Sequence, residues 1–188
     1  LVWANGFHRT KQLQLADLAA TDDAPDVLFT GTSKVWYGID AELFTEVGDA
    51  VRSLLSPDLV DCRMLDRRWS VKVWFGPDKP TRDHYECQVM GRRHIDGAEG
   101  IAVETGFHAE HRSVDENEAT MAPLVAAEQR WRKALGPDAQ LGPFLGADHW
   151  RRLSEVWLDP DLSDPEIGFE LASRLTDYIE TIEAIRRG

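Results

Sequence analysis

Apolar and polar residues alternate along three successive segments between Arg68 and His111. Successive side chains of a β-strand point to opposite faces of a sheet, so this alternation predicts three strands that form an antiparallel meander. One face would be apolar and carry Val71, Val73, Phe75, Tyr85, Cys87, Val89, Ile101, Val103 and Phe107. The other face would be polar and ionisable. A single apolar face is typical of an antiparallel sheet, because a parallel sheet is buried on both faces.

The rest of the pattern predicts one more strand and three main helices. Val60, Cys62 and Met64 alternate with polar residues, which indicates a strand before the meander. Apolar residues recur every three or four positions in the three helices. These helices are expected to begin at Asp40, Asp115 and Ser163. The predicted fold is therefore of the α+β class: an antiparallel sheet of about four strands with amphipathic helices packed on its apolar face.

The segment between the second and third of these helices has a less regular pattern. Residues 141–147 are loop-like, whereas Trp150, Leu153 and Trp157 have the spacing of a short helix. Pro123 would either kink the helix that follows His111 or lie in the first turn of a helix beginning near residue 120.

The length of 188 residues is enough for one domain with a substantial core and does not require a second. We therefore expect a single globular domain over residues 1–188. Residues 1–25 are a candidate N-terminal appendage, because a polar loop that ends in Pro25 follows a short apolar segment.

The charge and the apolar content narrow the classes of partner. The net charge of −12, from 33 acidic and 21 basic residues, would repel a phosphate backbone, so direct binding of nucleic acid is not expected. No apolar run reaches the length of about 18 residues that suggests a membrane-spanning helix. Both cysteines, Cys62 and Cys87, lie at apolar positions of predicted strands, which favours a reducing, cytoplasmic location.

The register of the second hairpin decides which polar side chains meet. Asp96 and Gly97 mark the turn, and a two-residue turn there would mix the polar and apolar faces. A three-residue loop over residues 95–97, with Gly97 left-handed, keeps the faces separate. It sets His84 opposite His108, Glu86 opposite Gly106, and Gln88 opposite Glu104. A slip of one pairing step would set His84 opposite Glu110 and Glu86 opposite His108, and the same side chains would still share one patch.

The polar face of the meander is the candidate ligand-binding site. Its residues are Lys72, Trp74, His84, Glu86, Gln88, Glu104, His108 and Glu110. Gly106, which has no side chain, would leave a space beside Glu86. In the simplest interpretation this is a solvated sheet face with opposite charges paired across strands. In the alternative interpretation His84, Glu86, His108 and Glu110 bind a divalent metal, since imidazole and carboxylate are ligands that suit zinc or iron.

No motif in the sequence identifies a reaction, so three functional hypotheses stay open. The first is a cytoplasmic binding or regulatory module that uses the polar face for a small molecule or a protein partner, without a cofactor. The second is a metal-dependent hydrolase, in which a metal-bound water is the nucleophile and a spare carboxylate is the base. The third is an acidic decoy that occupies a nucleic-acid-binding protein.

Overall fold

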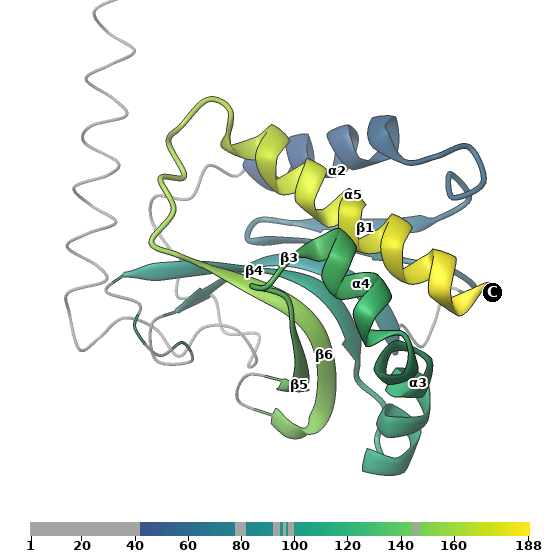
Figure 1. The fold of residues 1–188 in the computed structure, drawn as a ribbon. Helices are drawn as coiled ribbons and strands as arrows, with labels where there is room; N and C mark the ends of the chain where they lie inside the picture. The colour runs from purple at the N-terminus through teal and green to yellow at the C-terminus, as the bar shows by residue number, and fades with distance from the viewer. Residues whose placement is uncertain (1–41, 78–81, 92–94, 96, 98–99, 145–146) are drawn as a thin grey trace, which may run out of the picture.

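A computed structural model describes residues 42–77, 82–91, 95, 97, 100–144 and 147–188 (Figure 1). These residues form four α-helices and one six-stranded antiparallel sheet. In chain order the elements are α2 (Leu43–Leu54), β1 (Arg63–Arg67), β2 (Ser70–Trp74), β3 (Asp83–Gly91), β4 (Ile101–Ala109), α3 (Val114–Ala126), α4 (Glu128–Leu135), β5 (Gln140–Phe144), β6 (Ala147–Leu158) and α5 (Ile167–Arg186). The α+β class and the antiparallel sheet are confirmed, but the predicted number of about four strands is wrong.

The strand order across the sheet is β1-β2-β3-β4-β6-β5. The first four strands follow one another in sequence order, and the last three of them, β2 to β4, are the predicted meander. The register between β3 and β4 is the predicted one: His84 lies opposite His108, and Gln88 lies opposite Glu104. Gly97 has a φ of +86°, the left-handed conformation that the turn requires.

The two missed strands, β5 and β6, complete the sheet beyond β4. The segment with Trp150 and Leu153, predicted as a helix, is the extended strand β6, and it pairs with β4 over residues 151–158. The segment predicted as a loop contains β5, the edge strand. Pro143 lies in β5, next to an irregularity in the β5–β6 register. An edge strand accepts a proline because its outer side needs no ladder hydrogen bond.

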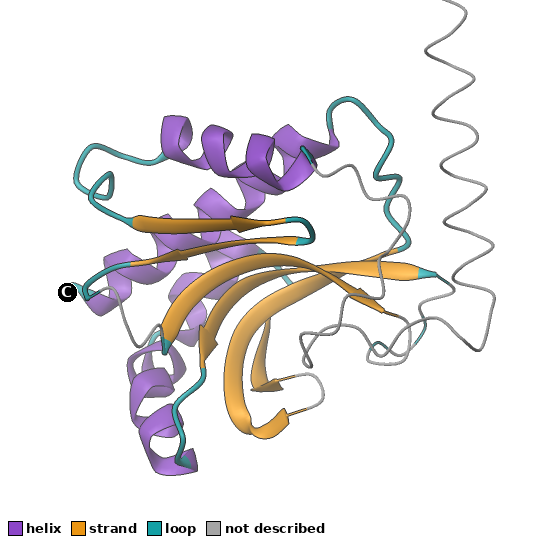
Figure 2. Cartoon of the chain, turned by 180° about the vertical axis from the view of Figure 1, so that it is seen from behind, coloured by secondary structure: helices purple, strands orange, loops and turns teal. Residues whose placement is uncertain are grey.

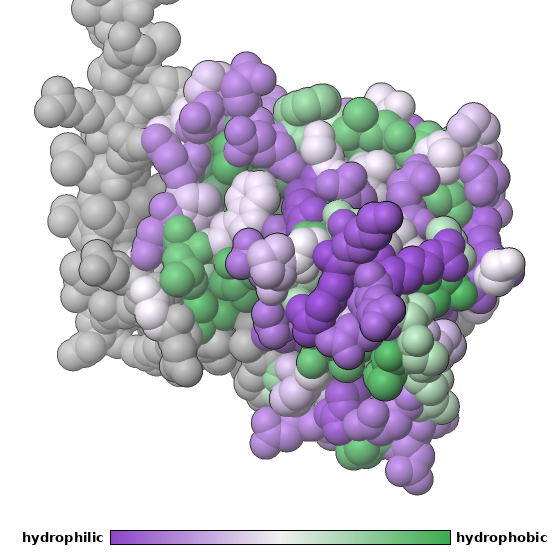
Figure 3. Space-filling view, viewed as in Figure 1, coloured by the Kyte–Doolittle hydropathy of each residue, from purple (hydrophilic) through white to green (hydrophobic). Residues whose placement is uncertain are grey.

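Helices α2 and α5 lie side by side over one face of the sheet, and α4 lies beside α5 (Figure 1). The apolar side chains of the meander and of these helices form one core, with Leu171, Leu175, Tyr178, Ile179 and Ile182 of α5 completely buried. Phe44, Val47 and Val51 of α2 extend this core over β1 and β2. The outer surface on the helical side is mainly hydrophilic, with small apolar patches, as expected for helices with one inward-facing stripe (Figure 3).

The sheet is strongly curved at β6. Figure 2 shows that β6 bends away from the helices, so that its first half and β5 lie below the polar face of the meander. Phe144, in β5, packs edge-on against His108 of β4, with ring centroids 4.8 Å apart. Phe144 also contacts the Trp150 ring. The curvature therefore brings an aromatic layer onto the polar face.

Several predicted boundaries differ from the structure by a few residues. Helix α3 begins after Ser113 rather than at Asp115, and it continues through Pro123. Helix α5 begins at Ile167, because residues 163–166 form turns in which the Asp164 carboxylate accepts a hydrogen bond from the Glu166 N–H at 2.9 Å. The predicted start of the first main helix, at residue 40, and the N-terminal appendage lie outside the described residues.

Candidate metal centre

The polar face of the meander is buried. His84 and Glu86 of β3 and Glu104 and His108 of β4 all point to this face, and His84, Glu104 and His108 have no exposed surface. Glu86 is 6% exposed and Gln88 5%. The simplest interpretation of the sequence, a solvated sheet face, is therefore wrong at these positions. Buried ionisable groups are expensive to desolvate unless they are paired or bind a ligand.

His108 is fixed by Glu104 on the same strand. Its Nε2 lies 2.9 Å and 3.0 Å from the two carboxylate oxygens of Glu104, and the Gln88 amide donates to the same carboxylate at 3.2 Å. Burial alone would lower the pKa of His108, but the adjacent Glu104 carboxylate outweighs it and raises that pKa. For Glu104 burial would raise the pKa, and His108 reverses the direction. Because Glu104 contacts Nε2, the Nδ1 atom of His108 faces away from Glu104.

Glu86 lies among three nitrogen atoms. Its Oε2 is 3.3 Å from Lys72 Nζ, 3.5 Å from His84 Nε2 and 3.8 Å from His108 Nδ1. Burial would raise the pKa of Glu86, but the His84 imidazole and the Lys72 ammonium group outweigh it and hold that pKa well below its usual range. Glu86 is therefore ionised at neutral pH.

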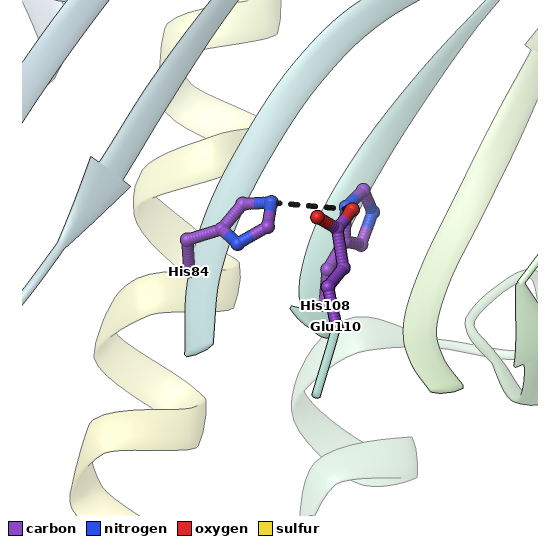
Figure 4. Close-up of side chains that lie close together, drawn as sticks. All are labelled: His84, His108 and Glu110. Atoms are coloured by element: carbon purple, nitrogen blue, oxygen red, sulfur yellow. Dashed lines mark ion pairs between the residues drawn. The ribbon is translucent and has the colours of Figure 1, made fainter. Parts of the chain in front are cut away.

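Glu110, just beyond the end of β4, closes the cluster. Its Oε1 lies 3.7 Å from His84 Nε2 and 3.9 Å from His108 Nδ1 (Figure 4). The two imidazole rings are nearly perpendicular, with centroids 5.2 Å apart. One donor atom from each of His84, His108 and Glu110 can be chosen so that all three lie within 4.8 Å of one another. Two ligands of one tetrahedral zinc ion are about 3.4 Å apart, given Zn–N distances of about 2.0–2.1 Å. Small side-chain movements would therefore close this set around an ion.

Three imidazole nitrogens of the cluster have no hydrogen-bond partner in the described part of the chain. They are Nδ1 and Nε2 of His84 and Nδ1 of His108, and all three are buried. Burial lowers the pKa of His84, so its imidazole is neutral at physiological pH, and one of its two ring nitrogens carries a lone pair. A neutral imidazole nitrogen without a hydrogen bond is the form in which histidine binds metals.

The structure brings together seven of the eight predicted site residues. Lys72, His84, Glu86, Gln88, Glu104, His108 and Glu110 form the connected cluster described above. Trp74 is separate: it donates its indole N–H to the Pro77 carbonyl at 3.1 Å and lines a cavity at the end of β2.

Sequence reasoning missed two groups that shape the cluster. Phe144 covers His108 from β5, a segment that was predicted to be a loop. Ser154 of β6 fills the space predicted at Gly106, because a Cβ atom added there would lie 2.2 Å from the Cβ of Ser154. Neither contact has a local signal in the sequence, since both depend on the pairing of β6 with β4 and on its curvature.

Comparison with known proteins gives no family and no relative: no protein-family model, curated protein or solved structure matches the chain. Within the part of the chain that the structure describes, no helix is long and apolar enough to cross a membrane. The geometry of the described residues is therefore the basis for inferring a function.

Proposed function

We propose that this protein binds a divalent transition metal through His84 Nε2, His108 Nδ1 and Glu110 Oε1. The observation that carries the proposal is a pair of buried imidazole nitrogens that face Glu110 and Glu86 and form no hydrogen bond with the described residues. A buried polar atom without a partner costs about 1–3 kcal/mol. A metal ion between the three side chains would supply the missing partner for both rings. Two imidazoles and one carboxylate suit zinc and iron among the common metals.

The surroundings of the three ligands support a metal site. Metal-binding histidines usually donate their second N–H to a carboxylate, which fixes the orientation of the ring. Glu104 occupies this position on His108, and Gln88 in turn holds Glu104. Phe144 packs against the ring of His108 and excludes water from one side of it. His84 lacks such a carboxylate at Nδ1, so its orientation depends on packing.

Glu86 favours a metal-dependent hydrolase as a second candidate function. Its carboxylate lies 3.5 Å and 3.8 Å from the two nitrogens that would bind the ion. It is ionised and stands where a spare carboxylate could either complete the coordination or accept a proton from a bound water. Lys72 would hold it in place.

The other hypotheses have less support. A small ligand suits a buried polar face better than a protein partner does, because almost no surface of His84, Glu86 or His108 is exposed. The acidic-decoy hypothesis still rests on the net charge alone. The cytoplasmic location stays a prediction, and it is supported by the two free thiols, Cys62 and Cys87.

Metal analysis of protein purified without chelator tests the proposal. We expect about one zinc, iron or manganese ion per chain, and after chelation we expect Co²⁺ to give the visible absorption bands of a histidine-ligated ion. His108→Ala and Glu110→Gln should each weaken metal affinity at least tenfold, since each removes one ligand. Glu110 is the safer variant for the fold, because its side chain is 18% exposed.

The matched control is His149→Ala. His149 is exposed, lies outside the cluster, and packs its ring against Trp150. This variant should bind metal like the wild type. The proposal fails if the wild-type protein contains no metal, shows no thermal stabilisation with Zn²⁺, Mn²⁺ or Fe²⁺, and gives no Co²⁺ spectrum.

A further inference from the structure

A cavity of about 410 Å³ lies at the end of the sheet where β2 ends and β3 begins, next to the start of α3. Small-molecule pockets in proteins usually have volumes of about 300–1,000 Å³. The lining includes two aromatic rings and several charged groups. The aromatic rings are those of Trp74 and Phe75, and the ionisable side chains are those of Arg82, Asp83, His111, Arg112 and Glu116. This cavity is separate from the buried histidine cluster, and none of the predicted metal ligands lines it.

The two carboxylates of the cavity already have partners within the protein. One oxygen of Asp83 lies 2.7 Å from His111 Nε2, and the other lies 2.7 Å from a guanidinium nitrogen of Arg186. Glu116 accepts a hydrogen bond from the Ser113 hydroxyl at 3.0 Å as part of a helix cap. Neither carboxylate forms an ion pair with Arg82 or Arg112.

Among the described residues, no carboxylate forms an ion pair with Arg82 or Arg112, the two arginines that line the cavity. Arg82 donates from NH1 to the backbone carbonyl of Glu110 at 3.2 Å, and this is its only side-chain hydrogen bond to the described residues. Arg112 is exposed and makes no hydrogen bond or ion pair with them. Arg82 and Arg112 therefore offer guanidinium N–H donors that no carboxylate of the described residues occupies.

We propose that this cavity binds a small organic anion, a carboxylate or a phosphate monoester, whose flat apolar part packs against Trp74. Guanidinium groups recognise carboxylate and phosphate through paired N–H donors. The indole ring of Trp74 is half-buried and held by its hydrogen bond to Pro77, so a rigid aromatic wall stands in the same cavity as two arginines that form no ion pair with the described residues. Charge and shape together select an anion with a planar group.

His111 is held in a fixed position at this cavity. The completely buried Asn117 accepts a hydrogen bond from the His111 N–H at 2.7 Å and donates to the His111 carbonyl at 3.1 Å. The same amide donates to the His149 carbonyl at 2.8 Å, which ties the site to β6. Asp83 orients the imidazole ring. A histidine fixed at both backbone and side chain is a preorganised contact for a ligand.

The test uses benzoate and phenyl phosphate as probes, with benzyl alcohol as the uncharged analogue. Binding is followed by calorimetry and by tryptophan fluorescence. We expect at least one of the two anions to bind at millimolar concentrations or below, and benzyl alcohol not to bind. Arg112→Gln should weaken that binding about tenfold, and Trp74→Leu should weaken it and remove most of the fluorescence change. Which of the two probes binds more tightly assigns the ligand to carboxylates or to phosphate esters.

Arg130→Gln is the matched control, because Arg130 is an exposed arginine of α4 outside the cavity. It changes the net charge by the same amount and should leave probe binding unchanged. Arg112→Gln is expected to fold, since Arg112 makes no contact that the fold needs. The proposal is overturned if neither anion binds, if benzyl alcohol binds equally well, or if Arg112→Gln and Arg130→Gln have the same effect. These outcomes are independent of whether His84 and His108 bind a metal.

Discussion

Gly106 lies on β4 between Glu104 and His108, with no side chain to separate them. Its backbone approaches β6 so closely that an added Cβ would lie 2.4 Å from the Leu153 carbonyl and 2.2 Å from the Ser154 Cβ. Both distances are far below van der Waals contact, and one of the neighbours is backbone. Glycine at this position therefore permits two things at once: the contact of Glu104 with His108, and the close pairing of β4 with the curved β6.

Gly106→Ala should destabilise the protein by about 3 kcal/mol, because β4 and β6 would have to separate to admit a methyl group. The measurement is urea-induced unfolding followed by far-ultraviolet circular dichroism. Gly142→Ala is the control: Gly142 also lies in a strand, but no atom lies within 4 Å of the Cβ it would gain. Equal stabilities of the two variants would contradict this account of Gly106.

At the residue scale the sequence could predict which side chains share a face, but not their environment. Alternation and the Gly97 turn placed His84 opposite His108, and the structure has this register. The burial of His108 could not be predicted, because Phe144, which covers it, comes from a strand that was not predicted. The pairing of Asp83 with His111 was also missed. A charged residue at an apolar position of β3, as Asp83 is, was the available signal.

The missed strand β6 shows how a buried ion pair can hide an alternation. Leu153, Glu155 and Trp157 occupy alternate positions of β6, and Leu153 and Trp157 join the helix-side core. Glu155 between them is charged, so the period of two is interrupted and Trp150, Leu153 and Trp157 acquire a helix-like spacing. The charge is tolerated because Arg174 of α5 pairs with it. Such pairing between distant segments cannot be read from local periodicity.

Ser113 is the only side-chain cap among the four described helices. Its hydroxyl accepts a hydrogen bond from the Glu116 N–H at 3.2 Å, and the Glu116 carboxylate accepts from the Ser113 N–H in return. Helix α3 lacks a strong apolar stripe: its buried residues are Asn117, Met121 and Leu124. The cap therefore matters more for this helix than for α5, which is held by a long buried face.

Ser113→Ala should lower the free energy of unfolding by about 1 kcal/mol, since it leaves the Glu116 N–H without its acceptor. Ser113→Thr retains a hydroxyl at the cap and should stay within a few tenths of a kcal/mol of the wild type. Chemical denaturation of the three proteins under the same conditions provides the comparison. If alanine and threonine proved equally stable, the capping hydrogen bond would contribute nothing measurable.

At the scale of the whole molecule, both sides of the sheet contain buried ionisable groups, but the two sides differ in how completely these groups are paired. On the helical side Glu155 and Glu183 are fully paired, with Arg174 and Arg187 respectively, and each also accepts a tyrosine hydroxyl. On the polar side the carboxylates are paired but three imidazole nitrogens are not. A satisfied network stabilises a fold, whereas an incomplete one points to a missing ligand. The helical side also has one buried oxygen without a partner among the described residues, Asp66 Oδ1, but the polar side gathers three such atoms from two facing histidines, which is the reason to place the candidate site there.

The network around Glu155 predicts how stability depends on pH. Its carboxylate is 4% exposed and accepts hydrogen bonds from Arg174 Nε at 2.8 Å and from Trp157 Nε1 at 2.7 Å. Burial would raise the pKa of Glu155, but Arg174 and Trp157 outweigh it and lower the pKa below the ordinary value of 4.5. A carboxyl whose pKa is lowered on folding contributes its full stabilisation above the unfolded-state pKa. That contribution is lost as the pH falls through the folded-state pKa.

Glu155→Gln should therefore be less stable than the wild type at neutral pH by about 3 kcal/mol, because Arg174 loses its partner. Below the unfolded-state pKa of about 4.5 the difference should shrink, by up to ~1.4 kcal/mol per pH unit, since only the wild type has this carboxyl to protonate. Urea denaturation at several pH values, with chelator present, measures the free energy of unfolding of the variant and of the wild type as a function of pH. Glu128→Gln is the control, because Glu128 pairs with Arg132 on the surface, where screening makes such a pair weak. The free energy of unfolding of Glu128→Gln should change with pH as that of the wild type does. If the free energy of Glu155→Gln also ran parallel to that of the wild type, the Glu155 carboxyl would not stabilise the fold through its ionisation.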